Sequence, residues 1–191
     1  MNLIVCSDIF GRTEALDELL IPFVEYYQKV KIVDPYSGKH CTFTDEDDAY
    51  RDFQQNCGLE TLTDSLTLSL ESVQGTSDLL GFSVGATATW LVTAKTHSTP
   101  IRQAICFYGS RIREYTDLEP LCPTSLIFPQ REEEFSVEQI AQQLETKNRT
   151  EIIRTAYHHG FMNRVSRNYS RIGCQTFNAW LREKVTINPS A

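Results

Sequence analysis

Short apolar runs alternate with longer amphipathic segments along the chain. The runs have the length of buried strands, whereas the segments between them carry apolar residues at the spacing of helices. The runs predict strands at 2–6, 30–33, 78–80, 103–107, 124–128 and 152–157. The intervening segments predict helices at 16–27, 45–55, 62–73, 86–95, 136–145 and 169–184. This alternation predicts an α/β fold: a mostly parallel sheet of about six strands with helices on both faces.

Turn and cap residues mark several of the expected boundaries. The turn Asp34-Pro35-Tyr36-Ser37-Gly38 ends the second strand, Ser136 is a helix cap, and Thr61 or Thr63 could cap the helix at 62–73. No Asn-Gly hairpin signal, internal repeat or Pro-, Gly- or Ser-rich linker interrupts the pattern. We therefore predict one domain over residues 1–191.

Composition and charge narrow the class of protein. The formal net charge of −7 argues against binding to nucleic acid or to an anionic membrane, both of which attract basic proteins. No apolar stretch approaches the roughly 18 residues of a membrane span, and MNLIVC is too short for the core of a signal peptide. The six cysteines are widely spaced, which favours reduced thiols over a disulfide framework or a zinc site. We expect a cytoplasmic protein without a metal site.

A candidate nucleophile follows the strand at 78–80. The stretch Gly81-Phe82-Ser83-Val84-Gly85 lies between that strand and the helix at 86–95. In this context the glycines permit a sharp turn that exposes the serine hydroxyl, and the following helix start offers the Val84 N–H to an oxyanion. By itself, G-x-S-x-G is more often an ordinary turn, so the other strand ends must supply the rest of a mechanism.

Partners for a reactive serine follow three other strands. Glu132, Glu133 and Glu134 come after the fifth strand, and His158 and His159 come after the last. The order serine, acid, histidine is that of α/β-hydrolases. The loop 7–11 after the first strand nominates the Ile9 N–H as a second oxyanion donor. The glutamate run could instead be a solvated helix entry, and His158 could be only a neighbour of the base.

Taken together, these segments resemble the dienelactone hydrolase family of α/β-hydrolases over almost the whole chain. The resemblance is carried by SDIFG (7–11), DPY (34–36), DAY (48–50), GFSVGA (81–86), FYG (107–109), EEF (133–135) and HGF (159–161). It implies an α/β-hydrolase fold. Because the sequence opens directly on the strand before the loop 7–11 and has no long insertion, we expect a minimal form without the opening antiparallel strands of most members and without a lid domain.

The resemblance also implies roles for individual residues. Ser83 matches the nucleophile, His159 the general base, and Ile9 and Val84 the oxyanion donors. The position of the family's triad acid aligns with Glu133, or with Glu132 or Glu134 if the alignment shifts by one residue. Asp8 matches an acidic residue beside the resting nucleophile, and Tyr50 of the DAY segment is expected to bind substrate.

Three departures from the family pattern bear on the substrate. Serine replaces the cysteine of the name-giving enzyme, as in esterase-like relatives, and glutamate replaces the triad aspartate. Acidic residues occupy 46–48, where the family has an arginine that binds the dienelactone carboxylate, and Met162-Asn163 follow HGF, with Arg164 one place beyond. Arg111 and Arg113 could provide a replacement clamp, and Arg113 and Arg164 are expected to bind substrate. These departures argue against dienelactone itself as the substrate.

Two functions are compatible with these observations. The first is a serine hydrolase that cleaves an ester or related acyl bond of a small molecule without a cofactor. The second is a catalytically weak or inactive relative that binds a small molecule or a partner protein in the same pocket. Neither the identity of the substrate nor the oligomeric state follows from the sequence.

Overall fold

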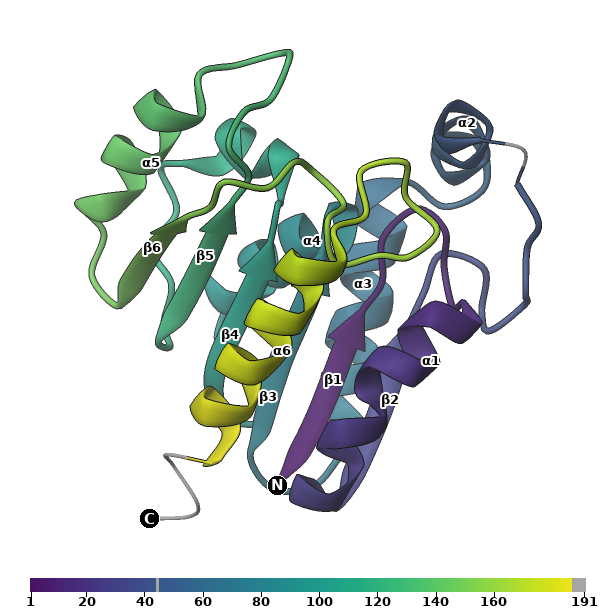
Figure 1. Ribbon diagram of the computed structural model, residues 1–191. Helices are drawn as coiled ribbons and strands as arrows, with labels where there is room; N and C mark the ends of the chain where they lie inside the picture. The colour runs from purple at the N-terminus through teal and green to yellow at the C-terminus, as the bar shows by residue number, and fades with distance from the viewer. Residues whose placement is uncertain (44, 187–191) are drawn as a thin grey trace.

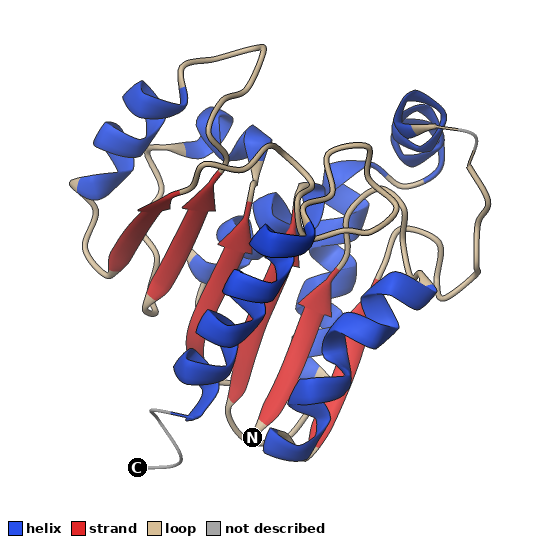
Figure 2. Ribbon diagram, viewed as in Figure 1, coloured by secondary structure: helices blue, strands red, loops and turns tan. Residues whose placement is uncertain are grey.

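A six-stranded sheet runs through residues 1–43 and 45–186, the part of the chain that the computed structural model describes (Figure 1, Figure 2). The strand order is β2-β1-β3-β4-β5-β6, and every neighbouring pair is parallel. The strands are β1 (Asn2–Cys6), β2 (Lys29–Val33), β3 (Ser77–Phe82), β4 (Ile101–Phe107), β5 (Thr124–Phe128) and β6 (Thr150–Arg154). The predicted parallel sheet is therefore confirmed.

Helices cover both faces of this sheet. The α-helices are α1 (Glu14–Leu20), α2 (Glu46–Asn56), α3 (Gly58–Glu71), α4 (Val84–Thr93), α5 (Val137–Glu145) and α6 (Arg171–Thr186), with 3₁₀ helices η1 (Ile21–Tyr26) and η2 (Ser110–Tyr115). α1 and α6 lie on one face and α3, α4 and α5 on the other, while α2 lies beyond the carboxyl ends of the strands (Figure 1). The expected two-faced covering is confirmed; the extent of the domain remains a prediction.

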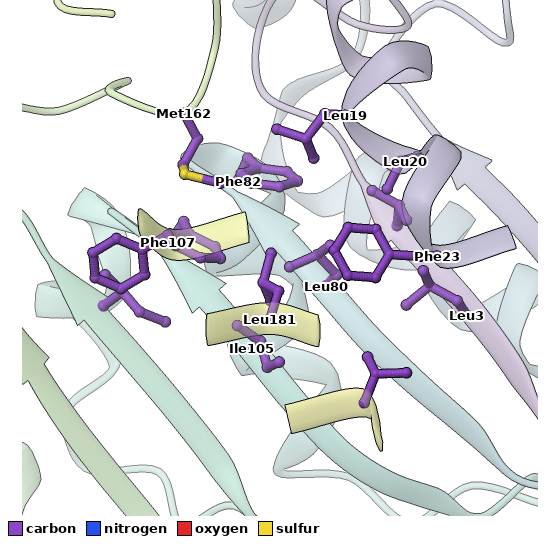
Figure 3. Close-up of a cluster of buried hydrophobic side chains, with 14 of the residues drawn as sticks. Leu3, Leu19, Leu20, Phe23, Leu80, Phe82, Ile105, Phe107, Met162 and Leu181 are labelled. Atoms are coloured by element: carbon purple, nitrogen blue, oxygen red, sulfur yellow. The ribbon is translucent and has the colours of Figure 1, made fainter. Parts of the chain in front are cut away.

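The core follows from the alternation of side chains along each strand. On β3, Leu80 and Phe82 point to the face under α1 and α6, whereas Leu79 points to the face under α3 and α4. Figure 3 shows Leu80 and Phe82 packed with side chains from α1, β4 and α6. Each large apolar side chain buried in this way contributes about 1.5–3 kcal/mol relative to exposure. The central strands are therefore a rigid support for the loops at their ends.

The first predicted helix differs from the observed one because of a proline. The helix begins at Glu14, with the Thr13 hydroxyl accepting a hydrogen bond from the Leu16 N–H at 3.2 Å. After Leu20 the chain continues as η1, with Pro22 in its first turn. Proline has no N–H to donate and clashes with the preceding turn, so 16–27 cannot be one regular α-helix.

Other predicted boundaries also differ from the observed ones. The helix expected at 62–73 begins at Gly58, and Thr63, a suggested cap, lies inside it and donates to the Leu59 carbonyl at 2.7 Å. Gly58 has φ +74°, which lets the chain turn directly from α2 into α3. The last strand ends at Arg154 instead of residue 157, and η2 was not expected.

The amino end of the sheet carries a buried ionic cluster far from the loops described below. Asp78 is 2% exposed and accepts hydrogen bonds from the Tyr27 hydroxyl at 2.7 Å and from Arg102 Nε at 2.7 Å. Because each polar group of the cluster has a partner, the cluster fixes how the end of η1 joins the sheet.

Within residues 1–43 and 45–186, no helix has both the length and the apolar character to cross a bilayer. All six cysteines are free thiols.

Candidate active site

Ser83 occupies a strained turn between β3 and α4. Its backbone has φ 53° and ψ −115°, in the positive-φ region that non-glycine residues rarely adopt. Hydrogen bonds on both sides hold it there: Ser83 N donates to the Phe107 carbonyl at 2.9 Å, and Thr87 N donates to the Ser83 carbonyl at 3.1 Å. A strained residue of this kind costs about 1–3 kcal/mol and is typical of functional sites.

The two glycines of the motif are required by close backbone contacts. A β carbon on Gly81 would lie 2.6 Å from the Ala86 Cα, and one on Gly85 would overlap the carbonyl oxygens of Cys6 and Ser7. Only glycine therefore lets α4 start this close to β1 and β3. The pattern G-x-S-x-G is a steric requirement of this turn.

A hydrogen-bonded chain connects the serine to a histidine and a carboxylate. The Ser83 Oγ lies 2.9 Å from His159 Nε2, and His159 Nδ1 lies 2.7 Å from Glu132 Oε1. The Tyr108 ring packs beside the imidazole, with 5.0 Å between the ring centroids. These contacts have the geometry of a nucleophile, a base and a carboxylate that orients the base.

The carboxylate that bonds His159 is Glu132, which the sequence left open as an alternative, and not Glu133, on which the family register falls. Glu133 is exposed at the rim of the same cleft, and Glu134 pairs with Arg113 at 2.6 Å. The loop after β5 is held close to the loop after β6, which contains His159, because Gln130 N donates to the Tyr157 carbonyl at 2.7 Å. A carboxylate two residues after that anchor is the one that reaches His159.

The two proposed oxyanion donors border the same space as Ser83. Ile9 and Val84 both line the cleft that contains the serine. Val84 is the first residue of α4, and a first-turn N–H has no partner inside its helix. The turn around Ile9 is tightened by Asp8, whose carbonyl accepts from Gly11 N at 3.1 Å and whose carboxylate accepts from Phe10 N at 3.0 Å.

Asp8 is a buried carboxylate at the base of this cleft. Its second oxygen accepts a hydrogen bond from Asn163 Nδ2 at 2.6 Å. Burial raises the pKa of Asp8 to about 6, although the bonds from Asn163 and Phe10 act in the opposite direction. The partner of Asp8 is thus a neutral amide, and no cation neutralises the carboxylate within hydrogen-bonding distance among the described residues.

The cleft around Ser83 has a volume of about 650 Å³ and a mostly charged rim. Tyr50, on α2, lines it and is 42% exposed. Arg113 also lines it, but its guanidinium is engaged by the Ser110 carbonyl at 2.7 Å, by Glu134 and by the Phe135 ring. Arg111 pairs with Glu114 at 2.9 Å. The arginines of η2 are therefore already neutralised by neighbouring acids.

Arg164 does not belong to the cleft. Its guanidinium pairs with Glu18 on α1, outside the residues that line the cavity. The loop after HGF directs this side chain toward α1, so the structure does not bring Arg164 to the other expected site residues, and its substrate-binding role stays a prediction. The neighbouring Asn163 points inward to Asp8 instead.

Sequence reasoning gave no role to two tyrosines beside the site. Tyr108, with φ 43°, is buried against His159. Tyr36 reaches the turn that contains Ile9. The segments FYG and DPY contain them, so the motifs marked the positions but not what the side chains touch. Within the described residues, no group of three or more histidine, cysteine or acidic side chains is arranged to hold a metal ion.

Comparison with known proteins places this geometry in a structural class. No protein-family model matches the chain. A proposed dienelactone hydrolase from Klebsiella pneumoniae superimposes with a TM-score of 0.74 at 17% identity, over 98% of this chain and 87% of that one. Alpha/beta hydrolase domain-containing protein 10 from mouse gives a TM-score of 0.65 at 10% identity, over 96% of this chain and 89% of that one. The chain therefore has the α/β-hydrolase fold.

Sequence similarity extends to one curated relative over part of its length. The chain is 40% identical over 96 residues to an uncharacterised protein, YczH, of Bacillus subtilis strain 168. The match spans 49% of this chain and 46% of that protein, so this chain covers less than half the length of its curated relative. Among proteins of the α/β-hydrolase fold, the overall arrangement is similar to that of dienelactone hydrolase-like structures.

Proposed function

We propose that this protein is a serine hydrolase that cleaves an ester or related acyl bond of a small molecule. The observation that carries the proposal is the unbroken chain from Ser83 Oγ through His159 to Glu132, with separations of 2.9 Å and 2.7 Å. This chain of contacts begins at the strained turn of Ser83, which lines a cleft large enough for a small molecule.

In the proposed reaction, Ser83 attacks the substrate carbonyl carbon while His159 Nε2 takes its proton. Glu132 holds the imidazole in the tautomer that presents Nε2 to the serine, and it stabilises the imidazolium that forms. The N–H groups of Ile9 and Val84 donate to the oxyanion. His159 then returns the proton to the leaving group, and water hydrolyses the acyl-enzyme by the reverse sequence of proton transfers.

The charges around the cleft favour an acyl group without a negative charge. Asp47 and Glu133 line it together with the buried Asp8. Of the arginines that line it, Arg111, Arg113 and Arg167 are paired with acids, Glu46 being the partner of Arg167, and Arg131 is exposed to solvent. A carboxylate on the acyl group would meet these acids without a free arginine from η2 to balance it. We therefore propose neutral acyl esters, and not a dienelactone, as the substrate class.

Steady-state hydrolysis of p-nitrophenyl esters of graded acyl length tests this function. We expect turnover by the native chain and a loss of about 10³-fold or more in kcat for Ser83→Ala, because the nucleophile is removed. Equal turnover by the two folded proteins would instead support a non-catalytic pocket. That alternative is motivated by the irregular acid and by the altered arginine clamp positions; the contact of Glu132 with His159 bears on the first of these alone.

A further inference from the structure

Tyr36 reaches across from the turn after β2 to the loop that contains Ile9. Its hydroxyl donates a hydrogen bond to the Ile9 carbonyl at 2.6 Å, and the Ala49 carbonyl of α2 lies farther away, at 3.5 Å. The side chain is buried, and its ring fills the space beside Gly11, where a β carbon would lie 2.5 Å from the Tyr36 ring. Tyr36 therefore contacts the Ile9 turn through both its ring and its hydroxyl.

The Tyr36 side chain is itself held in one direction. The Asp34 carboxylate accepts hydrogen bonds from Tyr36 N and Gly38 N, both at 2.8 Å. Ser37 and Gly38 follow with φ 55° and 80°, which completes a tight turn. The Phe43 ring packs beside Tyr36, with 5.5 Å between the centroids. Because Tyr36 is held by these contacts, its hydroxyl fixes the position of the Ile9 carbonyl that accepts its hydrogen bond.

The Ile9 carbonyl is a further anchor of a turn whose preceding residues are tied to Val33 through Ser7 N and to Asn163 through the Asp8 carboxylate. On one side of Ile9, the Asp8 carbonyl accepts from Gly11 N and from the Ser7 hydroxyl, each at 3.1 Å. On the other side, Phe10 N donates to the Asp8 carboxylate. Only the bond from Tyr36 ties the Ile9 peptide to another part of the sheet among the described residues. Without it, the peptides flanking Ile9 have more freedom to rotate.

We propose that Tyr36 is a positioning residue that fixes the orientation of the Ile9 N–H toward the oxyanion of the reacting ester. This inference rests on the proposed hydrolase function, since it assigns a purpose to a contact in the oxyanion turn. An oxyanion donor acts only when it is aimed at the developing charge before the reaction begins. Tyr36, in the turn after β2, orients the Ile9 N–H in advance without contacting the substrate.

The ionisation state of Tyr36 supports a permanent donor role. Burial, together with the negative charge of Asp52, raises the pKa of Tyr36 above its ordinary value. The phenol therefore stays protonated at neutral and mildly alkaline pH. Loss of the hydroxyl should lower the rate by the same factor at every pH in this range, leaving the shape of the pH–rate profile unchanged.

The variant Tyr36→Phe removes the hydroxyl and keeps the ring. Tyr27→Phe is a matched control, because that hydroxyl also makes a buried 2.7 Å hydrogen bond, to Asp78 at the opposite end of the sheet. For Tyr36→Phe we expect kcat for p-nitrophenyl acetate to fall about tenfold with KM nearly unchanged, since only the transition state carries the oxyanion. The control is expected to keep the native kcat. Amide hydrogen exchange should accelerate in the peptide covering residues 7–11 for Tyr36→Phe only.

The outcomes separate this inference from the proposed function. Native kcat and native exchange at residues 7–11 in Tyr36→Phe would overturn the positioning role, and so would an equal loss of kcat in Tyr27→Phe. If the native protein and Ser83→Ala were equally inactive, the hydrolase function would fail and with it the catalytic purpose of Tyr36. Faster exchange at residues 7–11 would then still establish the ordering contact by itself.

Discussion

At the scale of single residues, the proposed site depends on which of three neighbouring glutamates contacts the histidine. Glu132 bonds His159 at 2.7 Å with its side chain 14% exposed, whereas the neighbouring glutamates face solvent or Arg113. Three consecutive residues of the same chemistry thus have three different environments. Their roles depend on the conformation of the loop and not on their composition.

The substitution Glu132→Gln tests that difference, with Glu133→Gln as a control of identical chemistry. The first should lower kcat by roughly 10²–10⁴-fold, because an amide neither fixes the reactive tautomer nor balances the imidazolium charge. The second should leave kcat within about twofold of native, as expected for an exposed rim residue. Measuring kcat for both variants decides the matter, and a larger loss from Glu133→Gln would contradict the assignment.

Asp8 makes stability depend on pH in a direction opposite to most carboxylates. Its pKa is about 6 in the folded protein and near 3.8 in the unfolded chain, so the folded state binds more protons between these values. Stability from Asp8 is therefore present at low pH and is lost as pH rises through about 6. The groups that modify this titration are His159, which lowers the pKa, and Glu46, which raises it.

Denaturant unfolding of the native chain and Asp8→Asn, near pH 4.5 and pH 7.5, measures this effect. The variant cannot titrate at position 8, so the native chain should lose about 2 kcal/mol of unfolding free energy relative to it between the two pH values. Carboxylates that do not interact with Asp8 act equally on both proteins and cancel in the difference. A difference that stays constant with pH, or that changes in the opposite direction, would refute the raised pKa.

At the scale of elements, the turn between β3 and α4 connects packing to chemistry. Gly81 and Gly85 permit the helix to begin against the backbone of β1, which places Ser83 at the strand ends with the N-terminus of α4 directly behind it. The strain at Ser83 is maintained because the surrounding core is well packed on both faces of the sheet. The same contacts therefore determine both stability and the position of the hydroxyl.

The variants Gly85→Ala and Gly75→Ala separate steric overlap from backbone strain. Gly75 has φ 80° with open space where a β carbon would lie, so alanine there should cost about 1–2 kcal/mol of backbone strain only. Gly85 has an ordinary φ, but its β carbon would overlap two carbonyl oxygens, so alanine there should cost about 3 kcal/mol or more. Thermal or denaturant unfolding provides the comparison. A smaller cost at Gly85 than at Gly75 would contradict the steric account.

The sequence predicts elements better than it predicts their ends. Apolar runs identify β1 and β5 with the correct limits, because strands buried on both faces have near-continuous hydrophobic sequence. Pro22 and Gly58 changed two helix boundaries through local backbone effects that apolar spacing does not register. The 3₁₀ helix η2 has too short a pattern to be recognised from periodicity.

At the scale of the whole molecule, the site forms where the strand order reverses. β1 and β3 are neighbours in the sheet, and β2 lies beyond β1 on the other side, so the loops after β1 and β3 open a crevice between them. Asp8, Ile9 and Ser83 line this crevice, and the loops after β5 and β6 bring Glu132 and His159 to it. Segments far apart in sequence thus meet because the parallel strands all end at one edge.

This topology explains which parts of the site the sequence could predict. Placing Ser83, His159 and the loop 7–11 needs only the rule that sites form at the carboxyl ends of parallel strands. Choosing Glu132 over Glu133, placing Arg164 beside α1 and recognising Tyr36 require the conformations of irregular loops, which depend on hydrogen bonds between distant segments. Periodicity contains no information about those bonds.

Covalent labelling by a fluorophosphonate probe, with the modified residue mapped by mass spectrometry, tests the central claim most directly. We predict modification of Ser83 in the native protein, no labelling of Ser110 or Ser166 in the same cleft, and much slower labelling of Ser83 in His159→Ala. A natively folded protein whose Ser83 stays unmodified, or one labelled equally fast without His159, would contradict the assignment of Ser83 as an activated nucleophile.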